Sequence, residues 1–155
     1  MVSPELLRRY PFFGSLTEAE LRSIAMVTEE EAHTTGDLLF KANRAADALY
    51  LLIDGSIDLI YIVDEPGNGS VHKEFHVGEI NPGEVFGISA LIEPHAYTAT
   101  ARVGQAARVL KIEASALRAV LEVDPLMAYG LMRYVAKTAI ERLNDTRVQL
   151  AAARA

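Results

Sequence analysis

The chain has 155 residues, half of them hydrophobic, which is long enough to bury the core of a single domain. Its formal net charge of −6 argues against a nucleic-acid surface, which needs clustered lysine and arginine. The lack of cysteine excludes disulfides, thiolate catalysis and cysteine-ligated zinc. No apolar run reaches the roughly 18 residues that cross a bilayer, and the first residues do not resemble a leader, so we expect a cytoplasmic protein with no membrane partner.

Residues 1–30 are predicted to form N-terminal helices. Thr17 and Glu20 have the spacing of a capping box, in which each side chain accepts a hydrogen bond from the other residue's backbone N–H. This pair predicts a helix that runs to about Met26.

Residues 31–113 change to short apolar runs separated by turn residues, a pattern typical of antiparallel strands. The runs 49–53 and 57–63 flank Asp54-Gly55-Ser56, which predicts a hairpin with a glycine in its turn. Another turn is predicted at 65–70, and one or two further strands at 101–112. The count of about eight strands predicts a closed roll, because closure removes exposed edges.

The stretch 81–101 holds a turn at Pro82-Gly83, then two strand residues, Gly87, a helical turn over 88–92 and a new strand from Thr98. A glycine followed by a helical turn lets backbone N–H groups approach a bound anion. The same pattern also fits a sharp corner of a sheet that binds nothing. The spacing alone leaves both interpretations open.

Residues 115–155 are predicted to be helical. Asp124-Pro125 is a typical start, with an N-cap aspartate and proline at the first helical position. Along the long helix a seam recurs with spacing three then four, formed by Tyr129, Met132, Ala136, Ala139, Leu143, Thr146 and Leu150. Its first half is expected to pack on the chain's own roll. Beyond Leu143 the seam needs a second helix to cover it, so we predict a homodimer through this helix.

The complete pattern predicts an α+β fold: an eight-stranded antiparallel β-roll (jelly roll) with N-terminal helices, a short helix over 88–92 and a long C-terminal helix. The segments Gly36-Asp37-Leu38-Leu39-Phe40, 48–57 and 82–87 resemble the cyclic-nucleotide-binding domain of the catabolite-activator-type regulators, kinases and channels. The resemblance extends from about Leu7 to Leu143 and implies one domain over 1–155, with a phosphate-binding cassette at 83–101. Asn43 stands where the family often has glycine, and asparagine tolerates a positive φ.

The resemblance assigns ligand binding to the cassette positions Gly87, Ile88, Ser89, Ala90, Tyr97 and Thr98. In the family, a glutamate accepts a hydrogen bond from the ribose and an arginine pairs with the cyclic phosphate. Ile88 and Tyr97 stand at these two positions, and His95 is the nearest candidate for a replacement cation. Losing both contacts removes about 1.5–3 kcal/mol plus about 1 kcal/mol, which weakens binding by roughly two to three decades.

We therefore expect a stand-alone sensory or regulatory module that does not bind cyclic AMP or cyclic GMP at cellular concentrations. Its pocket would be empty, self-filled or retuned to another small molecule. The alternatives are a cyclic-nucleotide sensor with an altered cassette and a ligand-free dimerisation or scaffold module.

Other classes of function have less support in the sequence. No catalytic triad, metal-ligand spacing or phosphate-binding loop points to an enzyme, and no cofactor is expected. A haem sensor would need a histidine ligand, but the spacing of the four histidines does not indicate one: His33, His72, His76 and His95. No DNA-binding domain is expected after the long helix.

Overall fold

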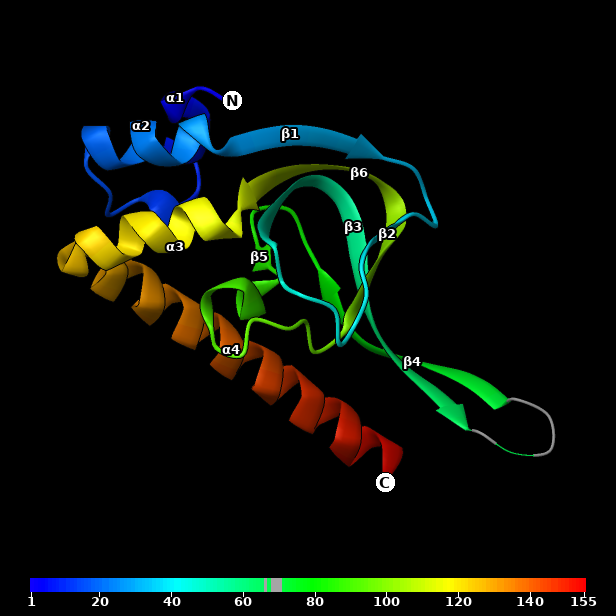
Figure 1. Ribbon diagram of the computed structural model, residues 1–155. Coiled ribbons are helices and arrows are strands. Elements are labelled where there is room, and N and C mark those ends of the chain that lie inside the picture. Colours follow the sequence, from blue (N-terminus) through cyan, green and yellow to red (C-terminus); the bar gives the residue numbers. More distant parts are fainter. Residues whose placement is uncertain (66, 68–70) are drawn as a thin grey trace.

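The computed structural model describes residues 1–65, 67 and 71–155, which form N-terminal helices, a curved antiparallel sheet and a long C-terminal helix (Figure 1). The first helices are α1 (Pro4–Arg8), η1 (Pro11–Phe13) and α2 (Glu18–Met26). The predicted capping box is confirmed, because the Thr17 hydroxyl accepts from the Glu20 N–H and the Glu20 carboxylate accepts from the Thr17 N–H. These local bonds fix the start of α2 where the sequence places it.

The described residues contain six strands, whereas the sequence predicted eight. They are β1 (Thr28–His33), β2 (Leu38–Phe40), β3 (Ala48–Glu65), β4 (Val71–Ile80), β5 (Val85–Phe86) and β6 (Thr100–Glu113). All pairs are antiparallel, in the order β1-β6-β3-β4, with β2 also paired to β6 and β5 to β3. The turn predicted at 65–70 falls mainly on residues 66 and 68–70, which lie outside the described residues.

The hairpin predicted at Asp54-Gly55-Ser56 is wrong. β3 continues through this tripeptide and pairs with β6 on both sides of it, with register shifts between. Gly55 has a φ of 89°, and a Cβ there would lie 2.3 Å from the Ala106 carbonyl oxygen. The glycine therefore allows a bulge that bends the strand around the roll, and the chain does not reverse. β3 runs unbroken through a bend where two separate strands were predicted, and β6 runs unbroken where one or two were predicted, so the described residues form six strands instead of eight.

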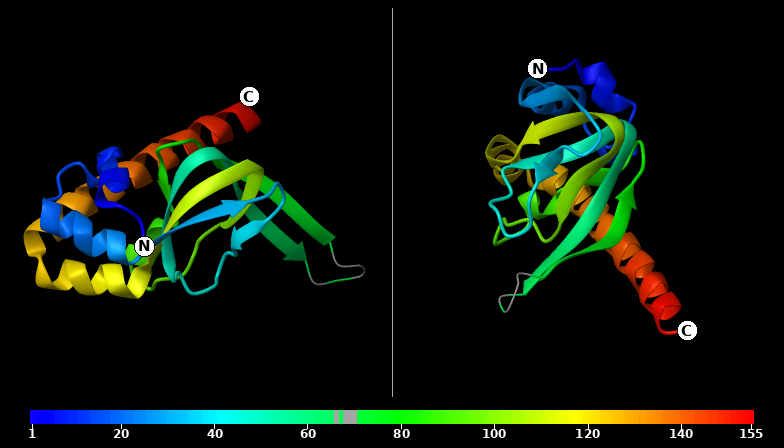
Figure 2. Two further views of the ribbon diagram at one scale, coloured as in Figure 1. Left: turned by 90° about the horizontal axis from the view of Figure 1, so that it is seen from above. Right: turned by 90° about the vertical axis from the view of Figure 1, so that its right-hand side faces the viewer.

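Two hydrophobic layers hold the structure together, and Figure 2 shows the helices α1, α2 and α3 gathered at one end of the roll. One layer joins these helices to the sheet and includes Leu7, Phe12, Phe13, Leu21, Ile24, Leu117 and Leu131. The other fills the roll and includes Tyr50, Leu52, Ile57, Phe86, Val103 and Val109. The cassette lies where the two layers meet, since Ala90 and Tyr97 belong to the first and Phe86 to the second.

The chain closes with α3 (Ala114–Val123) and α4 (Pro125–Ala153). The predicted start of α4 is confirmed, because the Asp124 side chain accepts from the Met127 N–H and Pro125 takes the first helical position. Figure 1 shows α4 running past the roll to the C-terminus. Among the described residues, no helix is both long enough and apolar enough to cross a membrane.

Candidate functional site: the cassette cavity

The cassette begins with a glycine that no other residue could replace without strain. Gly87 has a φ of 72° and precedes the short helix η2 (Ile88–Leu91), as the sequence predicted. A Cβ at this position would lie 3.3 Å from both the Ala48 carbonyl oxygen and a Tyr97 ring carbon, and 3.4 Å from a Phe40 ring carbon. The glycine therefore permits a left-handed conformation and a close approach at the same point.

A cavity of about 240 Å³ lies between the cassette and α4. Five of the six predicted ligand-binding residues line it: Gly87, Ile88, Ser89, Tyr97 and Thr98. The sixth, Ala90, is completely buried in the core instead. The sequence did not identify the remaining lining residues, which are Phe40, Leu59, Ala99, Ala139 and Arg142. The cavity thus combines the cassette with one face of the long helix, a pairing that only the fold creates.

Tyr97, which the sequence resemblance places at the arginine position, is buried in the structure. Its hydroxyl donates to the Ala48 carbonyl oxygen at 2.6 Å and accepts from the Ala48 N–H at 3.2 Å. Its ring stacks on Phe40, with ring centroids 3.7 Å apart and planes 13° from parallel. Burial raises the pKa of the Tyr97 phenol to about 12. The side chain therefore occupies the space inside the roll and keeps a neutral hydroxyl there.

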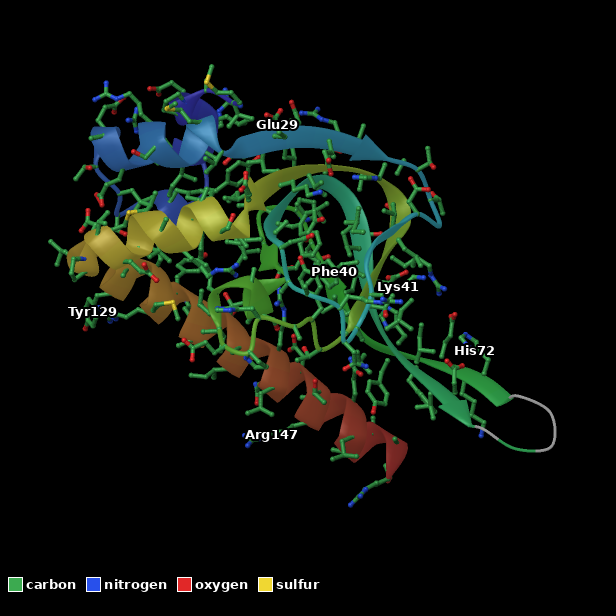
Figure 3. The ribbon with its side chains drawn as sticks, viewed as in Figure 1. Glu29, Phe40, Lys41, His72, Tyr129 and Arg147 are labelled. Carbon is green, nitrogen blue, oxygen red and sulfur yellow. The ribbon has the colours of Figure 1, made fainter. Side chains whose placement is uncertain are left out.

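Three further aromatic contacts extend this packing. Phe40, which Figure 3 places inside the curve of the roll, lies next to Tyr50 and Phe86, with ring centroids 5.8 and 6.2 Å away. Tyr50 and Phe86 stack on each other at 5.2 Å. Burial also raises the pKa of Tyr50. The interior next to the cassette is therefore filled by four aromatic rings of the protein itself.

The cation beside this cavity is Arg142, which the sequence analysis missed. The candidate His95 does not line the cavity, so that assignment is corrected. The Arg142 guanidinium is partly buried and donates to the Val85 carbonyl oxygen. Burial lowers the pKa of Arg142, although the carboxylates of Glu84, Glu141 and Asp145 act in the opposite direction. A sequence signal existed, because Arg142 continues the spacing of the core-facing line Met127, Leu131, Val135 and Thr138.

The four histidines lie elsewhere, and none lines the cassette cavity. Three contact carboxylates of their own or neighbouring strands: His33 with Glu31, His72 with Asp64 and Glu74, and His76 with Asp58. Within residues 1–65, 67 and 71–155, no group of three or more potential ligands could hold a metal ion.

The seam of α4 differs from the prediction in one respect. The first half of the seam was expected to pack on the roll and does not. The residues of α4 that are buried against the rest of the chain form a neighbouring stripe: Met127, Leu131, Val135 and Thr138. Tyr129 is 62% exposed, Leu143 49% and Leu150 51%. Ala136 and Ala139 are also exposed, and Met132 is partly buried. Apart from Met132, the seam is therefore open in the single chain.

Residues 30–124 match the family described as the cyclic nucleotide-binding domain. The chain belongs to this family. It is 38% identical to a putative cyclic nucleotide-binding protein from Geobacter metallireducens GS-15, covering 92% of this chain and 99% of that one with a TM-score of 0.78. It is 27% identical to the N-terminal domain of a transcriptional regulator from Streptomyces coelicolor A3(2), with coverages of 92% and 94% and a TM-score of 0.65.

A further relative is a putative potassium channel protein from Rhodopseudomonas palustris, 22% identical over 135 residues. The match covers 87% of this chain but only 31% of the channel protein. Segments similar to this chain thus occur in proteins of different kinds, and the family fixes the fold of this domain without fixing its ligand.

Proposed function

We propose that this domain is a regulatory module whose cassette does not take cyclic AMP or cyclic GMP at cellular concentrations. The observation that carries the proposal is the position of Tyr97, whose hydroxyl is bonded to Ala48 and whose ring is stacked on Phe40. A buried phenol in that place cannot form the bidentate pair that a guanidinium makes with phosphate. This lost contact accounts for about 1.5–3 kcal/mol of binding free energy.

The second family contact is also missing, because Ile88 packs against the hydrophobic core and has no acceptor for a ribose hydroxyl. Its loss adds roughly 1 kcal/mol. At about 1.4 kcal/mol per decade, the two losses weaken binding by roughly two to three decades. The cavity of about 240 Å³ also lies below the roughly 300–1,000 Å³ of most small-molecule sites.

A second candidate function is a cyclic-nucleotide sensor with an altered cassette. One observation favours it, since Arg142 brings a guanidinium to the cavity from α4. This sensor would use a cation on the long helix in place of one in the cassette. It would still have to displace the aromatic packing of Phe40 and Tyr97.

We further propose that the domain forms a homodimer through the exposed seam of α4, namely Met132, Ala136, Ala139, Leu143 and Leu150. Support comes from the heptad spacing of these residues and from the exposure of Leu143 and Leu150. A twofold arrangement would bury the same stripe on both copies. Because Ala139 belongs to both the seam and the cavity wall, occupancy of the cavity would act next to the dimer contact.

Calorimetric titration of the ligand-stripped protein with cyclic AMP and cyclic GMP tests the proposal. We expect no binding heat up to millimolar nucleotide. Micromolar binding of either nucleotide would refute the proposal that the pocket no longer takes cyclic nucleotides. Micromolar binding that disappears in Arg142→Met would establish the altered-cassette sensor, with Arg147→Met on the exposed side of the same helix as the matched control.

A further inference from the structure

Arg142 presents a positive charge that the described protein neutralises only in part. Arginine remains charged at any physiological pH, and burying an unpaired charge is costly. The guanidinium has five N–H donors, and within the described residues one of them donates to the neutral carbonyl of Val85. No ion pair joins Arg142 to a carboxylate within the described part of the chain, where the ion pairs of Arg8, Arg102 and Arg108 are found. Glu84, Glu141 and Asp145 act on the guanidinium only from beyond ion-pair distance, so its remaining N–H donors are available to an anion from outside the chain.

The walls of the cavity indicate what kind of anion would fit. Phe40, Leu59, Ile88 and Ala139 provide apolar surface. Ser89 and Thr98, which both carry hydroxyl groups, line the same cavity. Ser89 is partly buried and Thr98 is exposed, so a ligand in the cavity could reach either residue. One cation, two hydroxyls and apolar walls match an acid group attached to a small hydrophobic body.

We propose that the cassette cavity binds a small organic carboxylate, with its acid group on the Arg142 guanidinium and its apolar part against Phe40, Leu59 and Ile88. A carboxylate carries a single charge that one guanidinium can neutralise in a bidentate pair. Inorganic phosphate, unlike a carboxylate or a cyclic phosphodiester, carries on average more than one charge near neutral pH, which one cation and apolar walls do not compensate. The inference rests on the proposed function, because it needs a cavity that cyclic nucleotides do not occupy.

The test measures the melting temperature and the binding heat of the full chain with three carboxylate probes of increasing size: acetate, butyrate and benzoate. Benzamide serves as the neutral match to benzoate, and inorganic phosphate as an anion without an apolar body. We expect a saturable rise in melting temperature with butyrate and benzoate, and none with benzamide or phosphate. No response to any carboxylate would overturn the proposal, and so would a response to phosphate alone.

Variants of Arg142 separate binding from a structural role. Arg142→Met should weaken benzoate binding at least tenfold. Its ligand-free melting temperature should change little, because the lost hydrogen bond to the Val85 carbonyl and the removal of a partly buried charge act in opposite directions. Arg142→Lys keeps the charge without the planar fork and should bind with intermediate affinity. Arg147→Met should bind like the wild type. A lower ligand-free melting temperature in Arg142→Met, together with unchanged benzoate binding, would refute the assignment.

Cyclic AMP is titrated into the same samples, so that the two proposals can fail separately. Micromolar binding of cyclic AMP would refute the proposed function. Absence of carboxylate binding while cyclic AMP also stays silent would refute only the present inference.

Discussion

Replacing Tyr97 by phenylalanine tests whether the Tyr97 hydroxyl holds the ring in place, because it removes only the hydroxyl and retains the ring stacked on Phe40. The hydroxyl makes two hydrogen bonds to the Ala48 backbone, at 2.6 and 3.2 Å. A typical intramolecular hydrogen bond contributes a net 0.5–1.5 kcal/mol, so their loss should destabilise the fold by about 1–3 kcal/mol. For a domain of this size, a loss of about 2 kcal/mol corresponds to a fall in melting temperature of about 4–8 °C.

Thermal and urea denaturation, monitored by circular dichroism, measure this change. Tyr61→Phe is the matched control, because Tyr61 lies on the same sheet in β3 but is 54% exposed. We expect the control to melt like the wild type. If Tyr97→Phe also melted like the wild type, the hydroxyl would not hold the ring inside the roll. Tyr97 could then leave the cavity, and a cyclic phosphate would not be excluded from it by this side chain.

Three other perturbations follow from the same structure. The free energy of unfolding should fall as the pH rises from 10 to 12, because the Tyr97 phenol has a pKa near 10 in the unfolded chain but about 12 when buried. Urea titrations across this pH range should show a weaker fall in Tyr97→Phe. Gly87→Ala should cost about 1–2 kcal/mol for its left-handed backbone alone, and denaturation showing no loss would contradict the observed φ of 72°. Leu143→Glu should shift the protein from dimer to monomer in sedimentation, without lowering its melting temperature at low protein concentration. An unchanged dimer would exclude the α4 seam as the dimer interface.

The parts of the fold that the sequence predicted correctly depend on neighbours within a few residues. The Thr17 capping box, the Asp124 N-cap and the glycine before η2 each complete their hydrogen bonds or backbone requirement locally. Asn43 likewise has the positive φ, 67°, that its place in the family suggested. Such features need no knowledge of the tertiary structure.

The errors arose where a distant strand or helix decides the outcome. Gly55 could have opened a hairpin or a bulge, and the choice depends on β6, which pairs with β3 on both sides of it. The cavity depends in the same way on α4, so Arg142 could not be assigned from the cassette sequence. Its position at the end of the buried stripe of α4 marked it as core-facing, but the contact with Val85 required the fold.

The cation that lines the cavity is Arg142 on α4, not a residue of the cassette, and this changes how a ligand could act on this domain. A cassette arginine would connect a ligand to the roll, whereas Arg142 would connect it directly to the long helix. Ala139 and Arg142 both line the cavity, and the proposed dimer contact at Leu143 directly follows Arg142 in the chain. An anion that draws the guanidinium away from the Val85 carbonyl would exchange a contact with the roll for one with the ligand. Thermodynamic linkage then makes the effect mutual for a ligand that binds one position of α4 more tightly than another. The ligand changes the dimerisation constant by the same factor by which dimerisation changes the affinity for the ligand.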